Sequence, residues 1–307
     1  MDLVTMGRIS VDLYPEQIDV ALEDVSTFAK SLGGSPTNVA VAAARLGASA
    51  AVITKVGDDP FGVYCRRALR DFGVDDRYVG VHPTLRTPLA FCEIHPPDDF
   101  PLLFYREPKA PDLELELDAE RAAHVPLFWT TGTGLSQEPS RRRTLAALQG
   151  RKRRRWTVHD LDYRAMFWER PEQAGRWNRE ALAHATVAVG NAEEVAVALG
   201  EQLAPEAAAQ ALLGLGVELA IVKLGERGVL GATREEQVLV PPVEVEVVNG
   251  LGAGDAFGGA LCHGLLAEWP LERVLRFANA AGALVAGRLG CADDMPTADE
   301  VEALCAA

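Results

Sequence analysis

Short, continuous apolar runs alternate with longer segments of helical periodicity along almost the whole chain. The runs predicted as strands are Leu3–Met6, Ala50–Val56, Leu127–Thr131, Trp156–Asp160, Thr186–Gly190, Leu219–Leu224 and Gly228–Ala232. Helices are predicted at Pro60–Phe72, Ser140–Gln149, Pro171–Ala183, Ala192–Leu199, Pro205–Leu215, Gly254–Glu268, Leu271–Arg288 and Ala298–Cys305. Because strands without polar alternation are buried on both faces, this order predicts an α/β fold with a central, mostly parallel sheet and helices on both faces.

One region interrupts the alternation. Two β-like runs, at 88–95 and 102–107, are joined by the turn residues Pro96–Asp99. This is the pattern of a hairpin, which stands apart from a parallel sheet. Residues 11–30 also look extended. We predict that segments 11–30 and 87–107 form a small β element on a single domain spanning 1–307. The alternative is a surface hairpin without function.

Composition excludes several classes of protein. The chain has 307 residues, 48% of them apolar, and a formal net charge of −14, which argues against a nucleic-acid partner. It lacks an apolar run of about 18 residues and an N-terminal leader pattern, so we expect no membrane span and a cytoplasmic location. Five cysteines without a CxxC pair fit reduced thiols. We interpret the basic run Arg151–Arg155 as a solvated helix end.

The segment Val248–Phe257 reads Val-Asn-Gly-Leu-Gly-Ala-Gly-Asp-Ala-Phe and follows a β-like alternation over 243–248. A strand, a glycine turn and a helix start would place free backbone N–H groups and a helix dipole at one point, which suits an anion. Asp255 would repel a phosphate there. It makes sense as a base that takes a proton from a hydroxyl while the amides hold the phosphoryl group. The alternative is a glycine-rich helix cap.

A second glycine element lies near the N-terminus. Gly33 and Gly34 precede a predicted helix whose N-cap would be Ser35 and whose stop would be Gly47. The two glycines would leave room for a ligand, and Asn38 would offer a donor and acceptors on the first turn. The alternative is a capped core helix with a surface asparagine.

Together these motifs resemble the PfkB, or ribokinase-like, family of sugar kinases. Gly252, Ala253, Gly254, Asp255 and Phe257 match its C-terminal signature, and 33–38 and 55–62 match its N-terminal one. The resemblance implies a ribokinase-like fold with a β lid at about 11–30 and 87–107. It implies that Asp255 is the catalytic base, that the 252–255 amides form the anion hole, and that Asp12, Gly33, Gly34 and Asn38 bind the sugar.

Asn249 departs from the family pattern. Relatives place a carboxylate at this point near a monovalent-cation site, so activation by K⁺ is left open. Asn249, Gly250 and Leu251 are nevertheless typical of one subgroup of the family.

The resemblance also implies an ATP and Mg²⁺ site. Asn191 and Glu194 match an Asn-x-x-Glu element that organises Mg²⁺ and the nucleotide phosphates through water, although two polar residues at a helix start can simply stabilise its dipole. Nucleotide-binding residues are implied at Lys223, Gly225, Gly228, Asn279 and Gly282, with Phe277 and Ala280 beside the adenine.

Two arginines favour an anionic substrate, because a guanidinium pairs with a carboxylate through two hydrogen bonds. Arg106 follows the second hairpin run and Arg164 follows a strand; the alternative for each is a surface ion pair. The chain resembles most the family members that phosphorylate the primary hydroxyl of 5-dehydro-2-deoxy-D-gluconate in myo-inositol breakdown. A 2-keto-3-deoxygluconate kinase, a neutral-sugar kinase such as a fructokinase, and a catalytically silent sugar-acid or nucleoside sensor remain alternatives.

The hairpin has an exposed edge and one apolar face, so it needs a partner. We therefore predict a homodimer in which two lids pack together.

Overall fold

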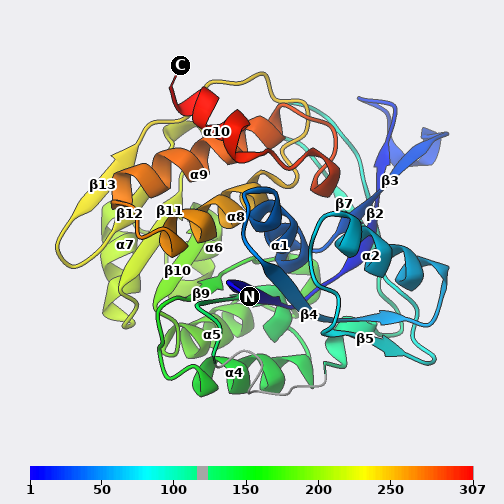
Figure 1. The fold of residues 1–307 in the computed structure, drawn as a ribbon, viewed down its shortest axis with the longest axis horizontal. Helices are drawn as coiled ribbons and strands as arrows, with labels where there is room; N and C mark the ends of the chain where they lie inside the picture. The colour runs from blue at the N-terminus through cyan, green and yellow to red at the C-terminus, as the bar shows by residue number, and fades with distance from the viewer. Residues whose placement is uncertain (116–123, 307) are drawn as a thin grey trace.

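The computed structural model describes residues 1–115 and 124–306, and its centre is a nine-stranded sheet (Figure 1). The strand order is β13-β12-β11-β10-β9-β8-β1-β4-β5. All neighbours in it run parallel except β11 with β12 and β12 with β13. The strands are β1 (Leu3–Met6), β4 (Ala50–Gly57), β5 (Val79–His82), β8 (Leu127–Thr131), β9 (Thr157–Asp160), β10 (Val187–Asn191), β11 (Leu219–Lys223), β12 (Val229–Ala232) and β13 (Gln237–Val240).

Helices cover both faces of this sheet, because successive side chains of each strand point to opposite sides. Leu3 belongs to the core cluster shared with one helical layer, and Val4 to the cluster on the other side. The first layer holds α1 (Ser35–Arg45), α2 (Pro60–Asp71), α8 (Ala253–Leu266), α9 (Leu271–Ala286) and α10 (Ala298–Cys305). The second holds α4 (Ser140–Gly150), α5 (Pro171–Leu182), α6 (Ala192–Leu199) and α7 (Pro205–Gly214). The predicted fold class is confirmed.

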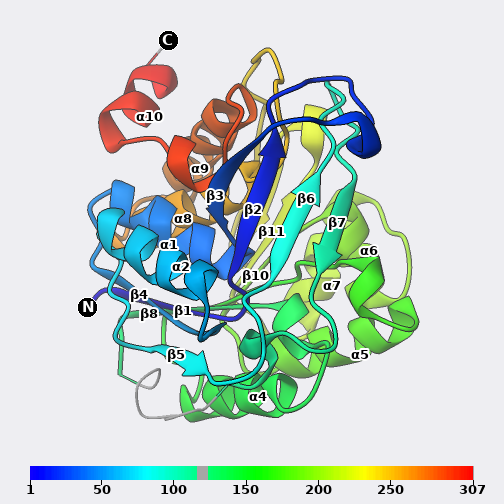
Figure 2. The ribbon, with the colours of Figure 1, turned by 90° about the vertical axis from the view of Figure 1, so that its right-hand side faces the viewer.

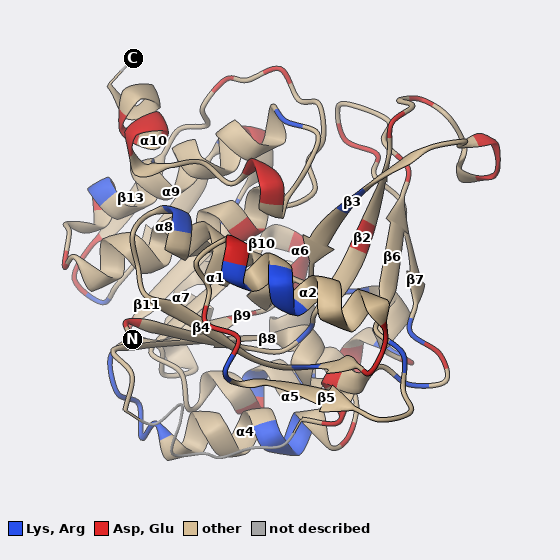
Figure 3. Cartoon of the chain, turned by 45° about the vertical axis from the view of Figure 1, so that its right-hand side comes forward, with Lys and Arg blue, Asp and Glu red and all other residues tan. Residues whose placement is uncertain are grey.

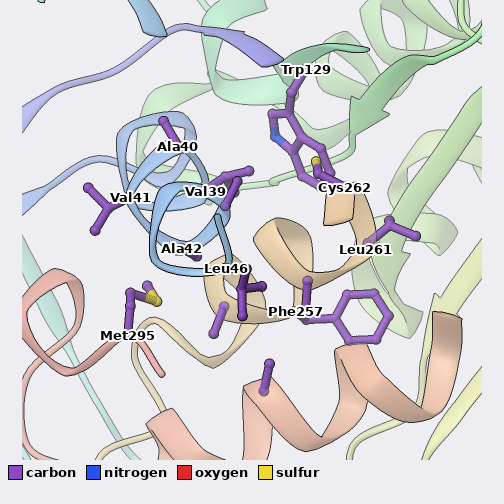
Figure 4. Close-up of a cluster of buried hydrophobic side chains, with 14 of the residues drawn as sticks. Val39, Ala40, Val41, Ala42, Leu46, Trp129, Phe257, Leu261, Cys262 and Met295 are labelled. Atoms are coloured by element: carbon purple, nitrogen blue, oxygen red, sulfur yellow. The ribbon is translucent and has the colours of Figure 1, made fainter. Parts of the chain in front are cut away.

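Helices α1 and α8 pack closely because the facing residues are small (Figure 4). A Cβ on Gly259 would overlap Ala42, and one on Gly258 would lie 2.9 Å from the Trp129 ring. Close packing of this kind leaves no space for an added methyl group. It brings the first turns of the two helices together, and both turns carry residues of the candidate site.

The segments 11–30 and 87–107 meet in one small sheet of order β3-β2-β6-β7 beside the main body (Figure 2). Its strands are β2 (Ser10–Pro15), β3 (Phe28–Gly33), β6 (Leu89–Cys92) and β7 (Leu102–Tyr105). The predicted hairpin is confirmed, since β6 and β7 pair antiparallel. Tertiary pairing places β2 between β3 and β6, a neighbour arrangement that local patterns do not reveal.

Three local predictions are wrong. Residues 241–248 form no strand; the N–H groups of Val248 and Asn249 instead donate to the Ala286 carbonyl. Helix α1 begins at Ser35 itself, and its N-cap is Gly34, with φ of 101°. Arg151 is not solvated, because its buried guanidinium donates to the carbonyls of Val125, Pro126 and Trp156 and so ties the end of α4 to the sheet.

Charge is unevenly distributed over the chain. Basic residues follow one another along α4, whereas acidic residues mark the loops at the far end of the small sheet and helix α10 (Figure 3). No helix within the described residues is long and apolar enough to cross a bilayer.

Candidate active site

Asp255 lies in the first turn of α8, where Gly252 is the N-cap with φ of 85°. This left-handed conformation favours glycine, and a Cβ there would also overlap the Cys291 thiol. The Asp255 carboxylate accepts a hydrogen bond from Asn38 Nδ2 of α1 at 2.9 Å. Burial raises the pKa of Asp255, which makes its carboxylate a stronger base than an exposed one.

The anion site at this helix start differs in one detail from the predicted one. The Asp255 N–H donates to the Gly252 carbonyl at 3.0 Å, so it is already engaged. Within residues 1–115 and 124–306, no acceptor contacts the N–H groups of Gly252, Ala253 and Gly254. These three amides, rather than four, are available to a phosphoryl group.

Asn38 and Asp12 lie on the small-sheet side of Asp255. Asn38 is almost fully buried, and its Oδ1 has no hydrogen-bond partner among the described residues, so it can accept a bond from a ligand hydroxyl. Asp12 accepts from Ser10 Oγ at 2.7 Å, and burial raises its pKa to about 6. Both side chains therefore offer polar atoms that a sugar can satisfy.

The two glycines of this region accommodate protein atoms, which differs from the prediction that they leave space for a ligand. A Cβ on Gly33 would overlap the Asp12 carboxylate. A Cβ on Gly34 would lie 2.5 Å from the carbonyl oxygen of Arg8. The glycines thus allow β2 and β3 to approach closely, and it is Asp12 that fills the space beside Gly33.

The two predicted arginines lie close to carboxylates. Arg106 forms a two-pronged pair with Asp112, at 3.2 Å for Nη1 and 2.5 Å for Nη2. Arg164 lies 3.4 Å from Asp162 Oδ1 and 3.8 Å from Glu194 Oε1. The ion pairs raised as an alternative are therefore present, but they lie at the site and not on a distant surface.

Sequence reasoning missed Arg8, which connects these two pairs. Its guanidinium donates to Thr133 Oγ1 at 3.1 Å and lies 3.6 Å from Asp162 Oδ2. It also lies 5.5 Å from the centre of the Phe167 ring, on which Arg106 packs at 5.4 Å. Arg8 is only 6% exposed, and burial lowers its pKa. The signal was that Arg8 is the only Lys or Arg before Lys30.

Lys223 ends β11 and places its ammonium group at the helix start. Its Nζ lies 3.4 Å from the position that a Cβ on Gly254 would take. Burial opposes its charge, but Asp160, Glu194 and Asp255 outweigh that effect and raise the pKa of Lys223. Lys223 is therefore a cation beside the three free amides.

Asn191 and Glu194 form a capping box at the start of α6. Glu194 N–H donates to Asn191 Oδ1 at 2.8 Å, and Asn191 N–H donates to Glu194 Oε2 at 2.7 Å. The helix-start interpretation of this element is thus correct in geometry. It still leaves Glu194 Oε1 facing the site, where it lies 3.8 Å from Arg164.

The carboxylates of this region fit a hydrated Mg²⁺ better than a closed metal cage. In the part of the chain that the structure describes, no three His, Cys, Asp or Glu side chains are grouped to hold a metal. Burial raises the pKa of Asp160, and the carboxylates of Glu194 and Asp162 add to this effect. Mg²⁺ keeps several waters and uses one or two carboxylates beside substrate phosphates, so Glu194 and Asp160 suit it as partners.

An open pocket of about 630 Å³ lies on the other side of the helix start. Its lining includes five of the residues predicted to bind the nucleotide, but not Asn191: Lys223, Gly225, Gly228, Asn279 and Gly282. It also includes Ala253 and Gly254, so the pocket ends at the free amides. Phe277 and Ala280 do not line it. The Phe277 ring stacks on His263 at 5.5 Å, and Phe257 lines the pocket instead.

Asn249 is fully buried, and both ends of its amide are bonded. Its Nδ2 donates to the Leu289 carbonyl at 2.7 Å, and its Oδ1 accepts from Leu251 N–H at 3.0 Å. The amide thereby joins the segment before α8 to the segment after α9.

Comparison with solved structures places the fold among sugar kinases. A protein from E. coli described as a ribokinase II, solved with ATP and Mg²⁺, matches with a TM-score of 0.89 at 26% identity. The match covers 99% of this chain and 98% of that one. An α/β sugar kinase is therefore the class that the fold and the site define.

The family follows from the sequence comparison. The model of the pfkB family of carbohydrate kinases matches residues 1–298, and the chain belongs to this family. It is accordingly an ATP-dependent sugar kinase. It is 32% identical to the 5-dehydro-2-deoxygluconokinase of Clostridium beijerinckii, covering 98% of this chain and 91% of that protein. The enzyme of that name from Geobacillus kaustophilus is 30% identical, with 98% and 92% covered.

Proposed function

We propose that the protein transfers the γ-phosphoryl group of ATP to the primary hydroxyl of 5-dehydro-2-deoxy-D-gluconate, as one step of myo-inositol breakdown. The names of its relatives support this substrate. The observation that carries the proposal is the arginine cluster, defined as Arg8, Arg106 and Arg164, on the small-sheet side of Asp255.

Within the cluster, Arg8 is the residue best suited to bind an anion. A buried guanidinium has five N–H donors, and here one hydrogen bond and one 3.6 Å ion pair serve them within the described residues. A buried charge with so little compensation is costly without a ligand. Arg106 and Arg164 are engaged by Asp112 and Asp162, so the two pairs frame Arg8 and fix the rings of Phe104 and Phe167 around it.

In the proposed reaction, Asp255 accepts the proton of the substrate hydroxyl, while Asn38 holds the Asp255 carboxylate in place. The amides of residues 252–254 and the Lys223 ammonium face the phosphoryl group and stabilise its developing charge. Asp12 and Asn38 Oδ1 bind and orient the sugar hydroxyls. Mg²⁺, when bound with the nucleotide near Glu194 and Asp160, supplies charge neutralisation.

We further propose that two chains pair through the small sheet. Its outer face carries edge-to-face contacts of Phe91 with Phe28 and Tyr105, each with 5.5 Å between ring centres. On the edge strand β7, Leu103 is 45% and Tyr105 60% exposed. Exposed apolar residues on an edge strand favour association with another surface, and a second small sheet offers the same residues in return.

The test of substrate is an ADP-release assay over a panel of 5-dehydro-2-deoxygluconate, 2-keto-3-deoxygluconate and fructose. The 5-dehydro acid should give the highest kcat/KM. Arg8→Leu should lower the preference for the acids over fructose by roughly 10- to 100-fold, as expected for loss of a charge-assisted hydrogen bond. Arg77→Leu, at an exposed pair with Asp75, is the matched control.

Three outcomes would contradict the proposal in whole or in part. If fructose is the best substrate of the unaltered protein, the cluster does not select a carboxylate. If Arg8→Leu slows acids and fructose by equal factors, Arg8 supports the fold of the site and not the choice of substrate. Preference for 2-keto-3-deoxygluconate would retain the carboxylate argument and change the sugar.

A further inference from the structure

The turn of the β6–β7 hairpin reaches the nucleotide pocket. Pro97 and Asp98, both exposed, line this pocket together with Gly225, Val243 and Phe257. Figures 1 and 2 both show the cyan hairpin end beside the gold segment that leads into α8. An element of the sugar-side sheet therefore contributes to the wall of the ATP-side pocket.

Phe100 makes a second contact between the hairpin and the catalytic segment. A Cβ on Gly250 would lie 2.8 Å from Cε2 of the Phe100 ring, so the ring packs directly against the Gly250 backbone. Gly250 precedes the free amides by two residues. Its lack of a side chain is what admits the ring, and the contact joins the hairpin to the loop that positions the phosphoryl site.

The hairpin turn is bonded to the rest of the small sheet. Glu93 accepts from the Leu22 N–H at 3.2 Å and lies 2.8 Å from His95 Nε2. The Asp19 N–H donates to the Ile94 carbonyl at 2.9 Å, and Ile94 is fully buried. These bonds join the turn to the β2–β3 connection. A movement of the small sheet therefore carries the turn with it.

We propose that Pro97 and Asp98, in the turn 95–100, are nucleotide-binding residues, through which binding of ATP and binding of the sugar acid strengthen each other. Asp98 lies in the pocket with Glu226 and Glu244, whereas Lys223 and the free amides lie at its inner end. Carboxylates repel phosphate, so Asp98 faces the neutral base and ribose, and ribose hydroxyls are suitable donors to it. The coupling rests on the proposed function, because closure of the small sheet on the sugar presses the turn onto the nucleotide.

The experiment measures the affinity for AMP-PNP with Mg²⁺ by calorimetry, with and without saturating 5-dehydro-2-deoxygluconate. In the unaltered protein the sugar should tighten nucleotide binding about fivefold or more, the lower end of usual couplings, and the nucleotide should tighten sugar binding equally. Phe100→Ala should remove most of this factor while each ligand still binds alone. Leu103→Ala, on the outer face of the same hairpin, should retain it.

Asp98 and Asp99, two neighbouring carboxylates, allow a second experiment that needs no sugar. Asp98→Ala should weaken AMP-PNP binding about 2- to 10-fold, the range for a lost hydrogen bond. Asp99→Ala removes the same charge one residue away, at a position that does not line the pocket, and should leave the affinity unchanged.

The outcomes separate this proposal from the proposed function. Independent binding of the two ligands, full coupling in Phe100→Ala, or equal effects of the two aspartate variants would each overturn it. If 5-dehydro-2-deoxygluconate does not bind at all, the assigned substrate is wrong. The aspartate pair then still decides whether the turn contacts the nucleotide, and coupling is measured with the acceptor that the panel identifies.

Discussion

Asp255→Asn is expected to separate catalysis from binding and folding. Asparagine has the same shape as aspartate, and its amide oxygen can still accept the 2.9 Å bond from Asn38 Nδ2. What disappears is the proton acceptor. A positioned base contributes about 10²- to 10⁴-fold, so turnover should fall by that factor, a rise of about 3 to 5.5 kcal/mol in the barrier.

In Asp255→Asn, the free energy of unfolding should rise or stay the same although turnover falls. Burial raises the pKa of Asp255, so the ionised carboxylate is less favourable in the folded chain than in the unfolded one. Removing that charge at neutral pH should leave the free energy of unfolding equal or higher. A variant that is slow because it is misfolded would instead unfold more easily.

Rapid-quench single-turnover measurements isolate the chemical step, and calorimetry with AMP-PNP checks nucleotide binding. The rate of the unaltered protein should fall as pH drops through the raised pKa of Asp255, because the base must be ionised. Asp75→Asn, which changes a partly exposed carboxylate paired with Arg77, should keep full activity. More than half the normal single-turnover rate in Asp255→Asn would refute the assignment of Asp255 as the base.

Three further outcomes are expected. Burial lowers the pKa of His159 to about 4, so the stability gained by keeping His159 neutral is present above pH 6.5 and is lost as pH falls towards 4. In denaturant titrations, His159→Gln should reduce this loss in the free energy of unfolding by up to roughly 3 kcal/mol. An unchanged dependence of the free energy of unfolding on pH would contradict this prediction. Because the Asn249 amide is bonded at both ends, replacing K⁺ by Na⁺ should change turnover by less than about twofold. Asn249→Asp removes the donor to Leu289 and should reduce activity. Strong activation by K⁺ would show a cation site elsewhere. Light scattering at micromolar concentration should give twice the chain mass of 33.0 kDa, and Leu103→Glu should shift it towards one chain; a monomer in the unaltered protein would exclude the dimer.

The hydrophobic periodicity and the turn residues of the sequence were sufficient to predict most of the fold. Short runs with little polarity, such as Leu3–Met6, favour strands buried on both faces, and the structure has such a strand there. The hairpin at 87–107 followed from its turn residues. The alternation over 243–248 led to a wrong prediction, because an alternating segment forms a strand only where a neighbouring strand pairs with it. Here the backbone bonds to the end of α9 instead.

Asp255 could be proposed as the base from the sequence, because glycines beside one acidic residue at a helix start leave few chemical roles. The candidate nucleotide loop at 223–228 was implied by the family resemblance. The arginine cluster was not readable from the sequence. Arg8, Arg106 and Arg164 lie in three separate segments. The pairing of β2 with β6 and the ends of β7 and β9 bring Arg8 and Arg106 to the Phe167 ring, and Arg8 and Arg164 to Asp162.

The same holds for the hairpin turn. No local property of Pro97, Asp98 or Phe100 indicates the nucleotide pocket, which is formed by residues about 130 to 190 positions further along the chain. A sequence determines local periods, caps and turns because these depend on neighbours within a few residues. Which distant side chains share a site depends on strand order and helix packing, and these are decided by burial of the whole core at once.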